Sequence, residues 1–266
     1  MNARRFLPIL LAPWLAGGCF LFRSPAPVMA PIPPPAFNFD PNLLGKDAGG
    51  LAAAADRLCS PLTTRQQKVL GFALAQKGHD ASPHHVGAAL ALARCAALRA
   101  EWESDPMLLE QITEIGIESA KSAGAPDHDP RAAYWMSVSL GLSIRLHGLS
   151  ALPLLPVEMA ALKTAQKAPE LEMGGPLRAL GMLYLKAPSW PAGPGDLEEA
   201  IELLKTAAEA YPSHPLNHFF YADALRESGD GKTASAELQR AADLARPELW
   251  GEYAAKWQAD IQAMAK

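Results

Sequence analysis

Seven histidines are the residues most able to bind a metal ion, but their neighbours do not suit that chemistry. His84 and His85 are adjacent, so on a helix they would point about 100° apart. His214 and His218 lie on either side of Pro215, at a predicted helix start. Because no carboxylate or thiolate stands at ligand spacing nearby, structural or surface roles are favoured. We predict no metal site.

Two other patterns have the residue types of a nucleotide site or an acid–base pair. The segment Gly229–Thr233, GDGKT, ends like a phosphate-binding loop, but Arg226 stands where the first glycine belongs. Four carboxylates gather at a predicted helix start, where the helix dipole favours negative charge: Asp196, Glu198, Glu199 and Glu202. Neither a G-x-S-x-G nor an H-E-x-x-H motif is present. We predict that the protein is not an enzyme and has no cofactor.

The first residues resemble a bacterial lipoprotein signal peptide. MNARR is basic, the next residues are apolar, and LAGGC places small residues before Cys19, with the leucine one position further upstream than usual. The resemblance implies a signal peptide over residues 1–18 and lipid attachment at Cys19. Two alternatives are ordinary cleavage after Ala30, which Pro31 disfavours, and an uncleaved anchor over Phe6–Phe22, near the minimum spanning length.

Residues 19–42 are rich in proline and are predicted to form a tether. Such a segment adopts extended polyproline II structure at about 3.1 Å per residue, so it could hold a domain away from a membrane. A leader without a spacing role is the alternative. The predicted folded domain covers residues 43–266.

Cys59 and Cys95 are the two thiols that remain if Cys19 carries lipid. In an oxidising compartment we predict a disulfide between them, joining the first helix of the folded domain to the third. Two buried free cysteines, behaving as small apolar residues, are the alternative.

The composition is that of an all-α globular protein. Of 266 residues, 49% are hydrophobic and 20% are charged, and runs such as GAALALARCAALRA favour helix, whereas strand patterns are lacking. The formal net charge is -4, and no basic cluster is interleaved with aromatic residues. These features exclude a nucleic-acid partner.

A repeat of 34 residues is the strongest internal signal. Four residues recur in the same pattern, which places small side chains on one helix face: Ala200, Leu204, Ala207 and Ala208 return as Ala234, Leu238, Ala241 and Ala242. This period is typical of tetratricopeptide repeats. Partner helices are predicted around Gly181 and Ala222. We therefore predict an all-α, tetratricopeptide-like helix-pair solenoid.

Most turns within the predicted pairs are longer than in a regular repeat. In the last predicted pair, the small residue of the first helix is Ala222 and that of the second helix is Ala234, which lies 12 residues later. The corresponding separations are 18 residues from position 71, 20 from position 141 and 19 from position 181. We predict inter-helix loops lengthened by 6, 8 and 7 residues, respectively.

A narrower resemblance covers Asp129 to about Ala245. AAYWMSVSLGLSIR, the loop LKAPSWPAGPGD and YPSHPLNHFFYADAL, with the lipoprotein leader, resemble the T component of tripartite ATP-independent periplasmic (TRAP) transporters. The resemblance implies a periplasmic tetratricopeptide lipoprotein that engages a solute-binding protein and passes an apolar or organic-acid ligand.

Binding candidates come from the aromatic residues of the predicted first helices and the long loop. They are Tyr134, Trp135, Tyr184, Trp190 and Tyr221, together with Asn217, one turn before Tyr221. Core packing is the competing role for most of them. For Trp190 the alternatives are covering an apolar seam and presenting an aromatic anchor beside Tyr184 and Asn217.

The leading hypothesis is a lipid-anchored scaffold on the periplasmic side of the envelope, at the outer rather than the inner membrane. Its expected partner is a periplasmic solute-binding protein or another envelope protein, and homo-oligomers are left open. A pilotin- or secretion-type assembly lipoprotein is one alternative. A ligand carrier with an apolar tunnel is the other.

Overall fold

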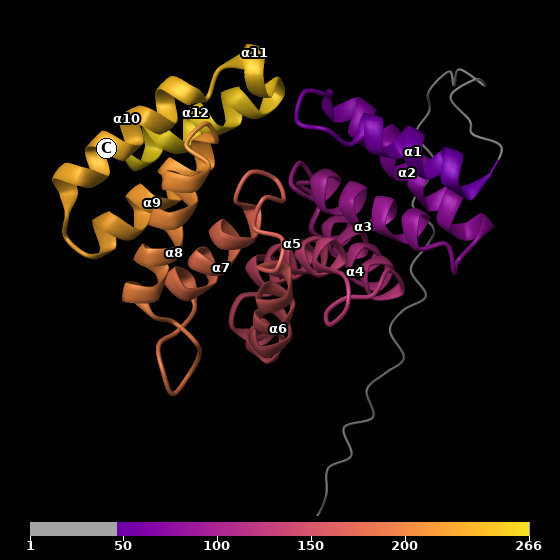
Figure 1. The fold of residues 1–266 in the computed structure, drawn as a ribbon, viewed down its shortest axis with the longest axis horizontal. Coiled ribbons are helices and arrows are strands. Elements are labelled where there is room, and N and C mark those ends of the chain that lie inside the picture. The colour runs from indigo at the N-terminus through magenta and orange to yellow at the C-terminus, as the bar shows by residue number, and fades with distance from the viewer. Residues whose placement is uncertain (1–46, 266) are drawn as a thin grey trace, which may run out of the picture. The chain divides into compact units, whose positions relative to one another are not determined.

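The computed structural model describes residues 47–265, which fold into helices joined mostly by short connections (Figure 1). The helices are α1 (Ala48–Leu58), α2 (Arg65–Ala81), α3 (Val86–Ala100), α4 (Pro106–Ser122), α5 (Pro130–His147), the 3-10 helix η2 (Gly148–Leu154), α6 (Leu155–Ala165), α7 (Gly175–Lys186), α8 (Leu197–Ala210), α9 (Pro215–Glu227), α10 (Gly231–Leu244), α11 (Pro247–Trp250) and α12 (Glu252–Met264). No strand forms within this range. The predicted signal peptide, Cys19 and the tether lie outside the described residues.

Side-chain caps in the sequence set where many helices begin. Before α2, the Thr64 hydroxyl accepts the Gln67 N–H at 3.2 Å, and the Gln67 side-chain oxygen accepts the Thr64 N–H at 2.8 Å. Before α5, the Asp129 carboxylate accepts the Arg131 N–H at 2.8 Å, and Pro130 occupies the first helical position. Each cap satisfies backbone donors that a helix start leaves without partners.

The helices stack as pairs, and the first helices of successive pairs touch one another. The pairs are α1 with α2, α3 with α4, α5 with α6, α7 with α8, and α9 with α10. Contacts between first helices join α1 to α3, α3 to α5, α5 to α7 and α7 to α9, and α9 also contacts α12. Each pair therefore contacts its neighbours, as in a solenoid. In addition, α12 meets the N-terminal pairs, since the Tyr253 ring lies 4.9 Å from the Trp102 ring. The predicted all-α helix-pair solenoid is confirmed.

The pairing at the N-terminal end differs from the one the sequence suggests. The segment around Gly71 was expected to be a first helix, with Ala89 on its second; instead α2 is the second helix of the first pair and α3 is the first helix of the next. A Cβ atom on Gly71 would lie 2.5 Å from the Cys59 sulfur, so this glycine serves the contact with α1. Small residues therefore show where two helices pack closely, but not which helix is the first of a pair.

Two of the three predicted loop extensions are present. The α7–α8 connection spans 187–196, whereas the α9–α10 turn spans only 228–230. Between α5 and α6 the added residues form η2. The extension predicted after Gly71 is absent: α2 continues to Ala81, so the added residues lengthen the helix.

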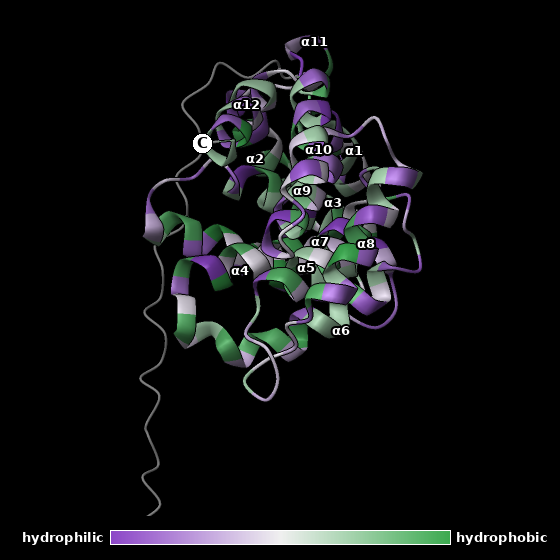
Figure 2. Cartoon of the chain, turned by 90° about the vertical axis from the view of Figure 1, so that its left-hand side faces the viewer, coloured by the Kyte–Doolittle hydropathy of each residue, from purple (hydrophilic) through white to green (hydrophobic). Residues whose placement is uncertain are grey.

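The repeated small residues bring the paired helices close together. Ala200, Leu204 and Ala207 have no exposed surface. A Cβ atom on Gly181 of α7 would lie 2.6 Å from Leu204, so only glycine fits there. In Figure 2, α8 and α10 carry both purple and green residues, as expected for helices with one buried face.

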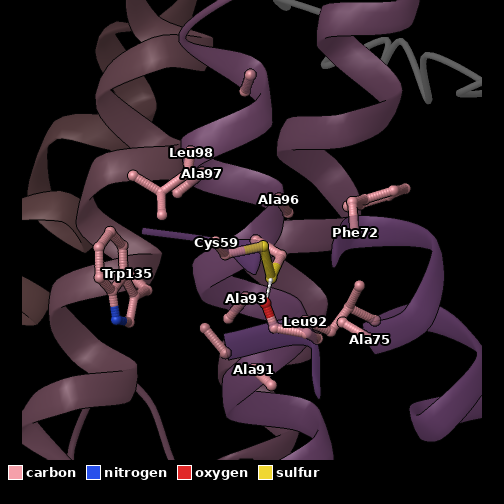
Figure 3. Packing of buried hydrophobic residues seen from close by; sticks show 14 of the residues in the cluster. Cys59, Phe72, Ala75, Ala91, Leu92, Ala93, Ala96, Ala97, Leu98 and Trp135 are labelled. Carbon is pink, nitrogen blue, oxygen red and sulfur yellow. Dashed lines mark hydrogen bonds between the residues drawn. A yellow bond between two sulfur atoms is a disulfide. The ribbon is translucent and has the colours of Figure 1, made fainter. Parts of the chain in front are cut away.

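Cys59 and Cys95 form a disulfide between the end of α1 and the middle of α3, as predicted. The sulfur atoms are 2.09 Å apart, the Cα atoms are 5.4 Å apart, and both residues are fully buried. Figure 3 shows Cys59 and its sulfur–sulfur bond among the small and branched side chains of α3, including Leu92 and Ala96. The bond therefore fixes the contact between α1 and α3, which are the first helices of the first two pairs.

The stretch Pro130–Ala165 is long and apolar enough to cross a membrane by composition alone, with a mean hydropathy of 1.4 in its most apolar window. It consists here of α5, η2 and α6, and α5 packs against α6. Residues of α5 such as Ala133, Met136 and Leu140 belong to the largest core cluster. The core accounts for part of this apolar stretch, since 28% of its most apolar window is buried.

Candidate interaction surface

Asn217, which the sequence suggested as a ligand-gripping residue, has no exposed surface. Its amide nitrogen donates to the carbonyls of Tyr211 at 2.9 Å, Met173 at 3.0 Å and Ala207 at 3.1 Å. Its oxygen accepts from Arg178 Nη1 at 2.6 Å. This corrects the expectation: in this conformation a partner cannot reach Asn217, which ties the start of α9 to α7 and α8.

Arg178 extends the same network into the α6–α7 turn. Its guanidinium donates to the carbonyls of Glu172 and Met173, each at 3.3 Å. These two residues have φ values of 46° and 50°, a left-handed backbone that disfavours side chains. Burial lowers the pKa of Arg178. The electrostatic fields of Tyr134, Glu172 and Glu101 act in the opposite direction and raise it. The network therefore stabilises a strained turn.

Tyr134 and Trp135 belong to the core, which was the competing role for these two candidates. Each is 6% exposed, and their rings pack 4.8 Å apart. Burial raises the pKa of Tyr134, whose hydroxyl lies beside Arg178. The Arg94 guanidinium lies 5.8 Å from the Trp135 ring centre. Neither side chain forms an open binding face.

Tyr184 and Tyr221 are half-buried on first helices. Tyr184 packs against the cluster formed by α5, α6 and α7, and Tyr221 packs against the C-terminal cluster. Asn217 is bonded to the start of α7, whereas Tyr184 lies near its end. The structure therefore does not bring Trp190, Tyr184 and Asn217 together into one site.

Trp190 is 86% exposed on the α7–α8 loop. The loop is braced from within, because the Gly195 N–H donates to the Pro188 carbonyl at 2.8 Å and the Asp196 N–H donates to the Tyr184 carbonyl at 3.0 Å. A Cβ atom on Gly195 would lie 2.2 Å from the Ala187 carbonyl, so this position requires glycine. The loop presents Trp190 to solvent and does not fold it over an apolar seam.

Other large apolar side chains are exposed at the equivalent turns. Leu62 between α1 and α2 is 62% exposed, Met107 at the start of α4 is 76% exposed, and Leu149 in η2 is 81% exposed. Each of these side chains lies in or beside a turn between the two helices of a pair. We call Leu62, Met107, Leu149 and Trp190 the turn surface. The sequence patterns did not single out Leu62, Met107 and Leu149, although each is a large apolar residue within or beside a turn.

Three of the side chains considered for chemistry, His214, His218 and Asp196, have structural partners. His218 Nδ1 lies 2.6 Å from the Glu237 carboxylate, and His214 lies 4.7 Å from the Trp250 ring. Burial holds the pKa of His214 well below its usual value. Asp196 accepts the first N–H groups of α8 as its cap. Within residues 47–265, no three metal-ligating side chains gather in one place.

Comparison with known families supports the fold. Residues 192–255 match the tetratricopeptide repeat family. The match covers less than half of the chain. The matched segment runs from the loop before α8 into α12 and contains the whole 34-residue period, with Trp190 immediately upstream. No curated protein matches the chain. Tetratricopeptide repeats suggest a scaffold for protein–protein interaction.

Proposed function

We propose that the protein is a lipid-anchored periplasmic scaffold that binds a solute-binding protein through the turn surface. The exposure of Trp190 on an internally braced loop carries the proposal. A tryptophan held rigidly in water gains free energy when a partner covers it, and rigid aromatic residues dominate many interfaces. Leu149 and Met107 provide further exposed apolar area at the turns of the two preceding pairs.

The choice of partner rests on the resemblance to the TRAP T component. The tetratricopeptide match over residues 192–255 supports a repeat fold, and tetratricopeptide repeats suggest a protein partner. The loop LKAPSWPAGPGD, which the resemblance includes, is the same loop that presents Trp190. An extended tether over residues 19–42 would let the domain reach a partner away from the membrane.

The anchor is tested separately from the partner. Replacing Cys19→Ser should leave an unprocessed or soluble form, because the acyl chains would be missing. If the variant still fractionates with membranes as a processed species of the original size, the lipid anchor is wrong. The binding proposal would survive that outcome.

The partner is tested by placing a photo-crosslinking amino acid at position 190 in the full-length protein in cells. A crosslink to a periplasmic solute-binding protein is expected. The same amino acid at Leu249, which is 44% exposed in α11, is the matched control and should give no such product. A secretion-machine component captured only at position 190 would favour the assembly lipoprotein. Equal products at both positions would refute a role for the turn surface.

A further inference from the structure

A small cavity lies between the start of α2 and the end of α3, at the edge that carries the first two turns. Its volume is about 30 Å³, and it is lined by Arg65, Lys68, Val69, Arg99, Trp102 and Glu103. Three of these side chains are cationic and one is anionic. Within residues 47–265, none of the three cations forms an ion pair. The lining therefore has two more cationic than anionic side chains.

Lys68 is buried to 1% exposure although it is charged. Its ammonium donates to the Thr63 carbonyl and lies 4.9 Å from the centre of the Tyr253 ring. Burial lowers the pKa of Lys68, and the fields of Glu252 and Glu101 oppose that shift. An ammonium out of water is costly without an anionic partner at contact distance.

Arg99 has the orientation of an anion-binding arginine. Its guanidinium carbon lies 4.7 Å from the centre of the Phe72 ring, which holds the group in one plane. Its Nε is buried, and no acceptor among the described residues meets it. Stacking leaves the edge of a guanidinium free to donate two parallel hydrogen bonds.

The nearby carboxylates are occupied by other donors. One Glu103 oxygen accepts the N–H groups of Ser104 at 2.9 Å and Asp105 at 3.1 Å. A Glu252 oxygen accepts the backbone N–H of Arg65 at 2.8 Å, so this carboxylate serves the start of α2. Glu252 and Glu101 therefore act on Lys68, and Glu103 on Arg99, through their fields, without an ion pair at contact distance.

We propose that this cavity binds a carboxylate group. Its volume has room for about two water-sized groups, which matches the two oxygens of a carboxylate. The stacked Arg99 would bind both oxygens, and Lys68 and Arg65 would balance the charge. The carboxylate comes either from a free small organic acid or from a polypeptide. This site is independent of whether the turn surface binds a solute-binding protein.

The test is an NMR titration of the full chain with sodium acetate, following the indole N–H of Trp102 and the Nε–H of Arg99. Both signals should shift saturably, and sodium chloride at the same ionic strength should not reproduce the shift. Arg99→Met should weaken binding at least tenfold while keeping the apolar contact with Phe72. Arg57→Met, at an exposed arginine in α1, is the matched control and should bind like the wild type.

A second variant and a peptide pair complete the design. Arg65→Gln changes an exposed side chain, so it should fold normally and weaken acetate binding several-fold. A short peptide with a free C-terminal carboxylate, compared with its amide, tests the polypeptide source; tighter binding of the acid than of acetate assigns that source. Tighter binding of inorganic phosphate than of either carboxylate ligand would overturn the carboxylate assignment. Unchanged binding in Arg99→Met, or no saturable shift with either ligand, would overturn the site.

Discussion

Replacing Asn217→Ala is expected to destabilise the fold by about 4 kcal/mol. The change removes the acceptor of the Arg178 hydrogen bond at 2.6 Å, and a bond to a charged group contributes about 1.5–3 kcal/mol. It also removes both amide donors, which contribute about 1 kcal/mol each. The three carbonyls that lose the amide each keep another donor, from Arg178, Tyr211 and His214, so they add little.

Urea and thermal unfolding measure this prediction. In a domain of this size, about 4 kcal/mol corresponds to a fall in melting temperature of about 10 °C. Gln239→Ala is the matched control, because the Gln239 amide donates to Asp243 at 2.9 Å on an exposed face. Its loss should cost less than about 0.5 kcal/mol.

A second substitution separates the two halves of the Asn217 network. Asn217→Asp keeps an acceptor for Arg178 but turns a carboxylate oxygen toward the backbone carbonyls of Met173, Ala207 and Tyr211. It should also destabilise, because it replaces attractive contacts with repulsive ones. If Asn217→Ala changes stability by less than about 1 kcal/mol while abolishing partner binding, the structural role is refuted.

Three further predictions follow from other sites. Replacing both Cys59 and Cys95 with alanine should lower the free energy of unfolding by about 4 kcal/mol, because the disulfide closes a loop of 36 residues in the unfolded chain. Mass spectrometry of unreduced peptides should find no alkylatable thiol at either position in the native protein. Burial raises the pKa of Glu158 to about 7, above its unfolded value of 4.5. Between these two pH values the native state therefore binds more protons than the unfolded state. The free energy of unfolding should fall by about 3 kcal/mol as the pH rises from about 4.5 to about 7. Glu158→Gln should abolish that dependence in urea titrations at pH 5 and pH 8, and an unchanged dependence would contradict it. Trp190→Ala should change stability by less than about 0.5 kcal/mol while weakening partner binding by about 2 kcal/mol, whereas a large loss of stability would assign the loop to packing.

The fold was predictable because it follows from local patterns. Small residues recurring from Ala200 to Ala241 require close contact between paired helices, and glycine and proline after Tyr184 stop a helix whatever surrounds them. The disulfide between Cys59 and Cys95 followed from the number of thiols and an assumed oxidising compartment.

The roles of single side chains were not predictable in the same way. Asn217 has the residue type of a binding residue. It is buried and has a structural role only because α7 and α8 pack around it and form hydrogen bonds with it. The order of helices within the first pairs was equally unpredictable from sequence. Gly71 indicates a close helix contact but not which helix it contacts.

The cavity near Arg99 could be decided only by tertiary structure. Arg65, Lys68 and Arg99 are spread over two helices in the sequence, and none forms a recognisable motif with the others. Packing α2 against α3 and bringing Tyr253 of α12 over Lys68 gathers their charges around one cavity. Sequence alone determined which segments are helical and how often they repeat, since these depend on neighbours along the chain. Which side chains meet, and which remain exposed, depends on segments distant in sequence.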